Sequence, residues 1–292
     1  MTLLGHWWAQ TATLATLGWL VAVPLSGWFA RVPWTAREPV AALLVWQAVG
    51  LSGGLAVLTA ELTLAASGQD GTWRHRVISV LSAPASVGLP GTVGLVLFSL
   101  SGLWLLGVLV TSFVRAARSR RTHRVLLELL SHPDRARDTR FDVIDSGAPV
   151  AYALPGRDPH VVLSTAARDT FSSNELRAVL AHERAHLRQR HSILVQPFVA
   201  WERSLPFLSA PRAARRRVEQ LVEMVCDDAA SHAVGATDLS SALTHLGVLG
   251  RDTDERLDRL ACPHTDPLLR IALLGCAAFL LLLPPALLLV AG

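Results

Sequence analysis

The chain alternates between long apolar segments and one polar central region. Four segments contain no Asp, Glu, Lys or Arg at all, at residues 1–30, 39–60, 89–114 and 271–292. A helix that crosses the hydrocarbon core of a bilayer needs about 20 predominantly apolar residues. The pattern therefore predicts a membrane region with three transmembrane helices at residues 1–114 and a fourth transmembrane helix at residues 271–292.

The polar region between them, residues 115–270, has the alternating pattern of a small folded domain. Strand-like runs lie at residues 141–144, 150–154 and 161–163. A helix follows from about residue 172, where Ser172 and Glu175 form the S-x-x-E pattern of a capping box. Arg188 to His191 would close it with positive charge. A second helix is expected at residues 211–233, ending near Gly235. The predicted fold class is a membrane α-helical protein with an α+β domain outside the bilayer.

Residues 193–208 are the one apolar run inside this domain. They are interrupted by Glu202 and Arg203 and contain Pro197 and Pro206. The run is too short for two membrane spans. We therefore expect it to lie against the bilayer surface.

Composition and charge support a membrane protein and set its orientation. Hydrophobic residues make up 51% of the chain and charged residues only 17%, which is unusual for a soluble enzyme. A basic run follows the third apolar segment directly, comprising Arg115, Arg118, Arg120, Arg121 and Arg124. The positive-inside rule then predicts a cytoplasmic domain in a bacterial cell membrane. Nucleic-acid binding would also explain these charges. Their position next to a membrane helix explains them sufficiently, so we expect no direct nucleic-acid partner.

Two features of composition carry less weight. The chain has no Lys, so all its basic charge is Arg, which is typical of a GC-rich, actinobacterial genome. Cys226, Cys262 and Cys276 are odd in number and fall in cytosolic or membrane segments. We interpret them as reduced packing residues rather than disulfide partners or metal ligands.

The sequence His182-Glu183-Arg184-Ala185-His186 carries the candidate chemistry. Residues four apart share one face of a helix, so His182 and His186 can bind a single Zn²⁺. Glu183 lies beside them and can act as general base for an attacking water. The alternative is a pair of surface histidines, but Leu176, Val179 and Leu180 predict that this helix is partly buried.

A third ligand is expected from the second helix, where Glu219, Glu223 and Asp227 fall on one face at i, i+4 and i+8. The alternative is a solvated face paired with Arg215 and its neighbours. Apolar residues flank Glu223, which we take as the ligand, with Glu219 as the second choice. Asp227 would then not bind the metal itself but would orient one of the ligand histidines.

These motifs together resemble the gluzincin membrane proteases. The resemblance rests on residues 149–156, 161–164 and 175–183, followed by an E-x-x-[AC]-D motif at residues 223–227. Two families share the pattern: the BlaR/MecR antirepressor peptidases and the group of HtpX and the CAAX prenyl proteases. Both use the Glu of that motif as third zinc ligand, so the resemblance implies a zincin-like zinc metalloprotease domain.

A further resemblance lies at residues 264–271, which are similar to the H-P-x(4)-R-I element of the prenyl-protease group. It implies that His264 and Arg270 stabilise the oxyanion of the tetrahedral intermediate, although Thr265 replaces the Pro. The alternative is that Arg270 only flanks a transmembrane helix.

The order of three spans, protease domain and one span resembles BlaR/MecR. It implies a regulatory endopeptidase that cleaves a cytosolic winged-helix repressor of the BlaI/MecI kind. The penicillin-binding sensor of that family is not found in this sequence, so β-lactam is not assumed as the signal. Two alternatives stay open: an HtpX-like quality-control or maturation protease of membrane proteins, and a non-enzymatic interaction protein with structural zinc.

Overall fold

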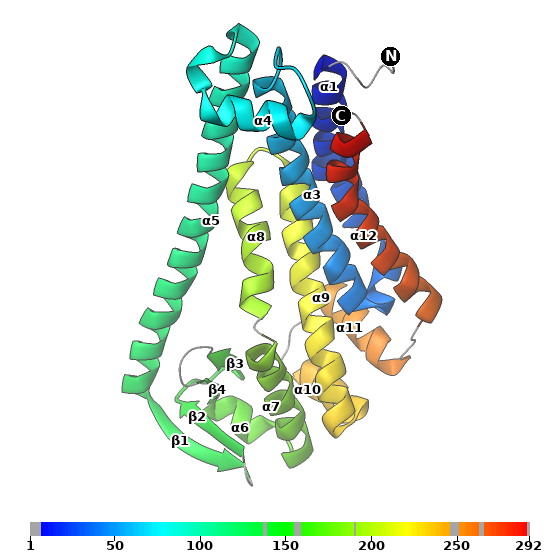
Figure 1. Ribbon diagram of the computed structural model, residues 1–292. Helices are drawn as coiled ribbons and strands as arrows, with labels where there is room; N and C mark the ends of the chain where they lie inside the picture. The colour runs from blue at the N-terminus through cyan, green and yellow to red at the C-terminus, as the bar shows by residue number, and fades with distance from the viewer. Residues whose placement is uncertain are drawn as a thin grey trace.

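The computed structural model describes residues 7–136, 139–154, 159–189, 191–245, 251–262 and 266–290 (Figure 1). Helices dominate these residues, with one small sheet at one end of the molecule. The first part of the chain comprises α1 (Trp7–Leu20), η2 (Val21–Leu25), α2 (Ser26–Phe29), η3 (Pro33–Arg37), α3 (Pro39–Ala65), α4 (Trp73–Ser82), η4 (Pro84–Ser86) and α5 (Leu89–Leu130). The last part comprises α10 (Ala236–His245), α11 (Arg251–Ala261) and α12 (Pro267–Val290).

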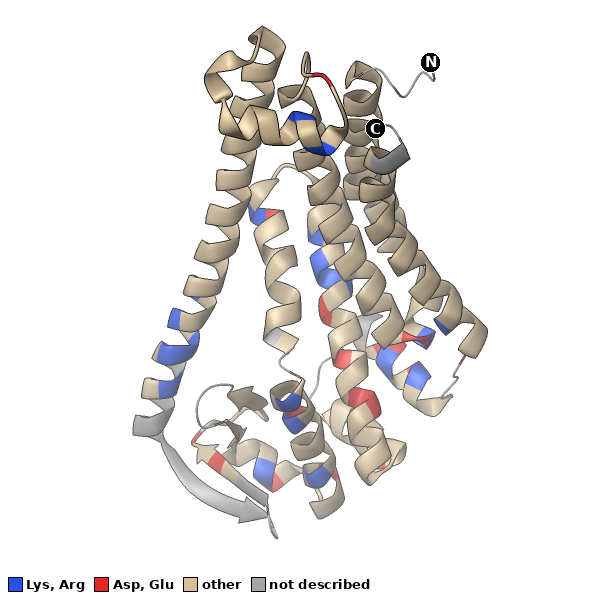
Figure 2. Cartoon of the chain, in the orientation of Figure 1, with Lys and Arg blue, Asp and Glu red and all other residues tan. Residues whose placement is uncertain are grey.

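Four helical segments of the described chain are long and apolar enough to cross a membrane, as the hydrophobic pattern predicted. They are Trp7–Phe29, Pro39–Ala65, Leu89–Thr122 and Pro267–Leu288. The predicted boundary at residue 114 falls inside a helix, because α5 continues without a break to Leu130. Its basic run lies at the end nearer the sheet (Figure 2).

The sheet has four strands in the order β1-β2-β4-β3. They are β1 (Ser131–Ala136), β2 (Thr139–Ile144), β3 (Ala151–Leu154) and β4 (His160–Ser164). β2 and β4 are parallel, and the two outer pairs are antiparallel. Three of the strands were predicted, whereas β1 was not. β3 is therefore an outer strand of the described sheet.

The helix that carries the histidine motif packs against this sheet. It is α7 (Ser173–Arg188), preceded by the short α6 (Thr165–Thr170). Ser172 and Glu175 form the predicted capping box: each side chain accepts a hydrogen bond from the other's backbone N–H. Leu180 is buried with Val161 and Leu163 of β4 in a shared core. The capped start and the apolar face thus fix α7 relative to the sheet.

The segment after α7 packs among the candidate membrane helices. It forms α8 (His191–Ser204) and α9 (Ser209–Val234), which contact each other, and α8 lies against α5 while α9 lies against α3 (Figure 1). Trp46 of α3 meets Phe198 of α8 edge to face, with ring centroids 6.1 Å apart. Gln47 donates to the Leu194 carbonyl at 3.0 Å. The α8–α9 hairpin and the first membrane helices therefore share one core.

Candidate active site

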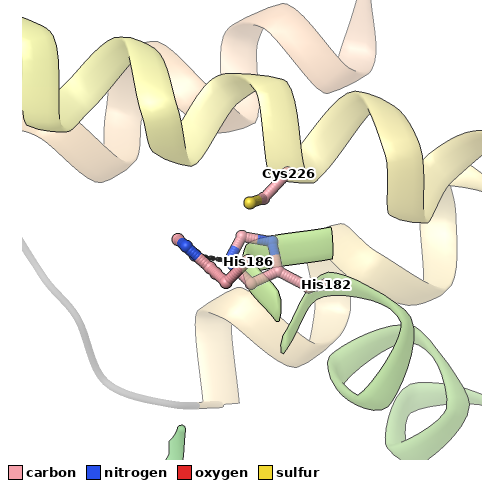
Figure 3. Close-up of side chains that lie close together, drawn as sticks. All are labelled: His182, His186 and Cys226. Atoms are coloured by element: carbon pink, nitrogen blue, oxygen red, sulfur yellow. Dashed lines mark hydrogen bonds between the residues drawn. The ribbon is translucent and has the colours of Figure 1, made fainter. Parts of the chain in front are cut away.

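The two histidines of α7 lie one turn apart and point at the same spot (Figure 3). Their Nε2 atoms are 3.2 Å apart. His182 is buried at 6% exposure, while His186 is partly open. Two ring nitrogens this close repel each other as lone pairs unless a proton or a cation lies between them. The pair is therefore arranged as a metal site would require.

Glu223 of α9 completes the cluster. Its Oε2 lies 3.3 Å from Nε2 of His182, and its Oε1 lies 3.3 Å from Nε2 of His186. Donors at zinc–ligand distances of about 2.0–2.1 Å in a tetrahedron stand roughly 3.3 Å apart. The three side chains thus have the spacing of a two-histidine, one-carboxylate zinc site.

Glu219, the second choice for the third ligand, lies elsewhere. It accepts a hydrogen bond from Arg215 at 2.6 Å, and Arg215 also binds Glu202 of α8. No described contact joins Glu219 to the histidines. The geometry therefore favours Glu223 of the two candidates.

Asp227 of α9 lies behind His182. Its Oδ1 is 3.0 Å from Nδ1 of His182, and its side chain is only 1% exposed. A proton on Nδ1 leaves Nε2 free to present its lone pair to a cation. Burial opposes ionisation of Asp227, but hydrogen bonds with Arg256 and His182 hold its pKa below the usual range.

Glu183 stands beside this cluster and next to the sheet. Burial raises the pKa of Glu183, against the opposing effects of His182, His186 and a hydrogen bond from the backbone of Ala153 in β3. A carboxylate whose pKa is moved toward neutrality is a better general base and acid at neutral pH. Its position between the histidine pair and β3 suits the role predicted for it.

Two residues of the site were not anticipated as neighbours of the metal ligands. Cys226 is buried, and its Sγ lies within 4.8 Å of ligand nitrogens of both His182 and His186. Burial raises the pKa of Cys226, as do the charges of Glu223 and the other carboxylates nearby. The neutral thiol fits the predicted packing role, and it would bind a metal only after losing its proton.

His191 is the second of these residues. It does not close α7 with positive charge but begins α8, where it is 3% exposed. Nδ1 of His191 lies 3.2 Å from Sγ of Cys226, and Nε2 lies 2.6 Å from Gln189. Burial first, and then the charge of His186, lower the pKa of His191 to about 4. The spacing from Glu223 to Cys226, i and i+3 on one helix, could have placed the cysteine here, but no local signal placed His191.

Of the two residues expected to hold the oxyanion, Arg270 alone lies among the described residues. Arg270, near the start of α12, binds Glu38 at 2.8 Å, at the start of α3. No described contact joins it to His182, His186 or Glu223. This agrees with the alternative that Arg270 flanks a membrane helix. His264 lies outside the described residues.

Comparison with known proteins supports a peptidase. The family model of peptidase family M48 matches residues 116–244. The matched part runs from the basic end of α5 to α10 and includes the histidine motif, Glu223 and Asp227. No curated protein and no solved structure matches the chain. The similarity indicates a metallopeptidase domain, and peptidases of this family depend on a metal ion, usually zinc.

Proposed function

We propose that this protein is a membrane-embedded zinc metalloendopeptidase. The observation that carries the proposal is the meeting of His182 and His186 with Glu223 at 3.2–3.3 Å, with Glu183 beside them. A structural zinc site has no need of the carboxylate at position 183. Zinc, when bound there, supplies a Lewis acid that polarises the scissile carbonyl and activates a water molecule.

The protein's own groups then provide the proton transfers. Glu183 accepts a proton from the attacking water and later gives it to the departing amine. Glu183 follows His182 directly on α7, which places its carboxylate beside the histidine pair. Asp227 keeps the His182 ring oriented through Nδ1.

Outer strand β3 supplies a binding edge for an extended substrate. α7, which carries Glu183, packs against β3, and β3 is an outer strand of the described sheet whose second edge is not paired with β4. A peptide that adds to this edge as a further strand would pass directly by Glu183. This arrangement suits an endopeptidase, because an edge accepts the middle of a chain as readily as its end.

The substrate class we favour is a cytosolic regulatory protein, a winged-helix repressor of the BlaI/MecI kind. The support is the order of the apolar helices around the domain, together with the basic run of α5, which lies at the same end of the molecule as the sheet (Figure 2). By the positive-inside rule that end is cytoplasmic. A site at that end meets cytosolic proteins.

A quality-control or maturation protease of membrane proteins is the second candidate. The specific observation in its favour is the packing of α8 and α9 among α3 and α5. One core joins residues of α9, such as Val222, to Trp46 and Val49 of α3. A site built on these helices is close enough to the bilayer to receive segments that emerge from it.

N-terminal labelling proteomics on cells that express the wild type or Glu183→Gln tests these alternatives. One dominant new N-terminus in a small DNA-binding repressor, present only with the wild type, would establish the regulatory protease. Many termini in membrane proteins would establish the second candidate. An identical set of termini from both strains, with purified protein that binds zinc but cleaves no unfolded protein, would reject the enzyme and favour a non-enzymatic zinc protein.

A further inference from the structure

Helix α11 brings a guanidinium group to the rear of the candidate zinc site. Arg256 donates from Nε to Oδ2 of Asp227 at 2.7 Å and from Nη2 to Oδ1 at 2.8 Å. Its Nη1 lies 3.4 Å from Oε2 of Glu223. One arginine thus contacts both the proposed carboxylate ligand and the carboxylate that orients His182.

We propose that Arg256 is the positioning residue of the zinc site, holding Asp227 and Glu223 in the geometry that binds the metal. This inference rests on the proposed function for its zinc ligands, and it adds a residue from a helix outside the histidine and glutamate motifs. A bidentate guanidinium–carboxylate pair fixes the plane and direction of the carboxylate as well as its charge. The direction of Asp227 in turn sets the orientation of His182.

Burial of the Arg256–Asp227 pair strengthens its effect on the site. Asp227 is 1% exposed and Arg256 10% exposed, so water has no access to the carboxylate and little access to the guanidinium group. A buried carboxylate that loses its cation is strongly destabilised, and its neighbours rearrange. The immediate neighbour of Asp227 is His182, at 3.0 Å. The loss of Arg256 would therefore first change the orientation of His182, a proposed zinc ligand.

The rest of α11 holds Arg256 in place. Glu255 binds Arg217 of α9 at 2.8 Å, and Arg259 makes a bidentate pair with Asp228 and donates to the Ala36 carbonyl at 2.8 Å. These contacts lie on either side of Arg256 along the helix. A positioning group needs such a rigid support, because a loosely held partner leaves the ligand geometry loose.

The same helix offers a matched control. Arg256 and Arg259 each form a bidentate pair with a carboxylate of α9, Asp227 and Asp228 respectively. Only Asp227 touches His182. A change at Arg259 therefore removes a similar ion pair from the same two helices and two bonds to backbone carbonyls, of Ala36 and Met224, but no side-chain contact with Asp227 or the proposed ligands.

The experiment measures zinc affinity of the purified full-length protein by competition with a chromogenic chelator, together with the visible spectrum of the Co²⁺-loaded protein. Arg256→Gln should weaken zinc binding by about 10- to 100-fold and shift the Co²⁺ bands. Arg259→Gln should change affinity by no more than about twofold. Arg256→Lys, which keeps the charge but not the bidentate geometry, should lie between the wild type and Arg256→Gln.

Equal zinc affinity and an unchanged Co²⁺ spectrum in Arg256→Gln would overturn the inference, and so would equal weakening by Arg256→Gln and Arg259→Gln. If Arg256→Gln does not fold, Arg256→Lys decides in the same way. The result is independent of proteolysis. A zinc defect in Arg256→Gln without any cleavage by the wild type would keep the inference and reject the enzyme, whereas cleavage by an Arg256→Gln protein with normal zinc affinity would do the reverse.

Discussion

Two carboxylates one turn apart on α9 show that the contacting residue determines the role of a carboxylate. Glu219 and Glu223 share a face of the helix and have similar side-chain exposure, 43% and 37%. Glu219 meets Arg215 of its own helix, whereas Glu223 meets the two histidines of α7. Neither residue type nor burial distinguishes the two positions.

The difference arises from which helix crosses α9 at each level. Near Glu219 the neighbour is α8, which supplies Glu202 to the same Arg215. One turn later the neighbour is α7, whose capped start and apolar face bring His182 and His186 to α9. Glu219 therefore forms an ordinary ion pair with an arginine, whereas Glu223, opposite two imidazoles, has the partners of a two-histidine, one-carboxylate zinc site.

The largest test of this comparison is a pair of truncations. Glu223→Ala removes one of three proposed zinc ligands, so purified protein should lose nearly all its bound zinc, as measured by elemental analysis after dialysis. Glu219→Ala should keep the zinc content of the wild type. The reverse pattern, with zinc lost from Glu219→Ala and kept by Glu223→Ala, would contradict the assignment of the ligand.

The pH dependence of zinc binding is the next effect in size. Burial alone would lower the pKa of His182, but hydrogen bonds with Asp227 and Glu223 raise it to about 9 in the metal-free site. Below that pH the ring carries a proton that zinc must displace. Zinc affinity should therefore rise about tenfold per pH unit and level off above the pKa of His182.

Competition with a chelator of known pH dependence, over a series of buffers from mildly acidic to mildly basic, measures this slope. Glu219→Ala serves as the control and should retain the slope of the wild type, since its carboxylate touches neither histidine. A zinc affinity that stays constant across the series would contradict a proton on the metal-free histidine pair.

At the position of Glu219 on α9, a substitution is expected to change the stability of the protein and not its zinc content. Arg215→Gln leaves Glu202 and Glu219 without their shared cation. Arg215 is 29% exposed, so the cost lies between that of a surface pair and a buried one, about 1–3 kcal/mol. The unfolding temperature in detergent, followed by tryptophan fluorescence, should fall, while zinc content stays unchanged. An unchanged unfolding temperature would show that water already screens both carboxylates.

Local patterns carried the parts of the site that could be predicted from the sequence. The capping box at Ser172 and the i, i+4 spacing of His182 and His186 depend on neighbours within one helix. Gly235, with φ of +100°, ends α9 near the predicted point, because a glycine tolerates a backbone that other residues avoid. The four apolar helices likewise follow from composition and length alone.

What escaped prediction depends on contacts between distant segments. Arg256 belongs to a helix rich in charges, where nothing marks one arginine as the partner of Asp227. The inward position of His191 depends on where α8 turns back toward α9. The polar composition of β1 gives no alternating pattern, and its strand exists through pairing with β2. Similarly, the packing of α8 against α5 and α9 depends on tertiary contacts, which the composition of α8 does not predict.

The smallest effect on stability is expected from Glu219→Gln, which removes only the exposed partner of Arg215. Arg215 keeps its contact with Glu202 in this variant, and the Glu219 side chain is 43% exposed, so water replaces the lost partner. The change in unfolding free energy should stay below about 1 kcal/mol, as for other exposed i, i+4 pairs. A double-mutant cycle with Arg215→Gln measures the coupling directly. Coupling well above that value would mean that Glu219 is less solvated than its 43% exposure indicates, and that its ion pair with Arg215 is not an ordinary surface pair.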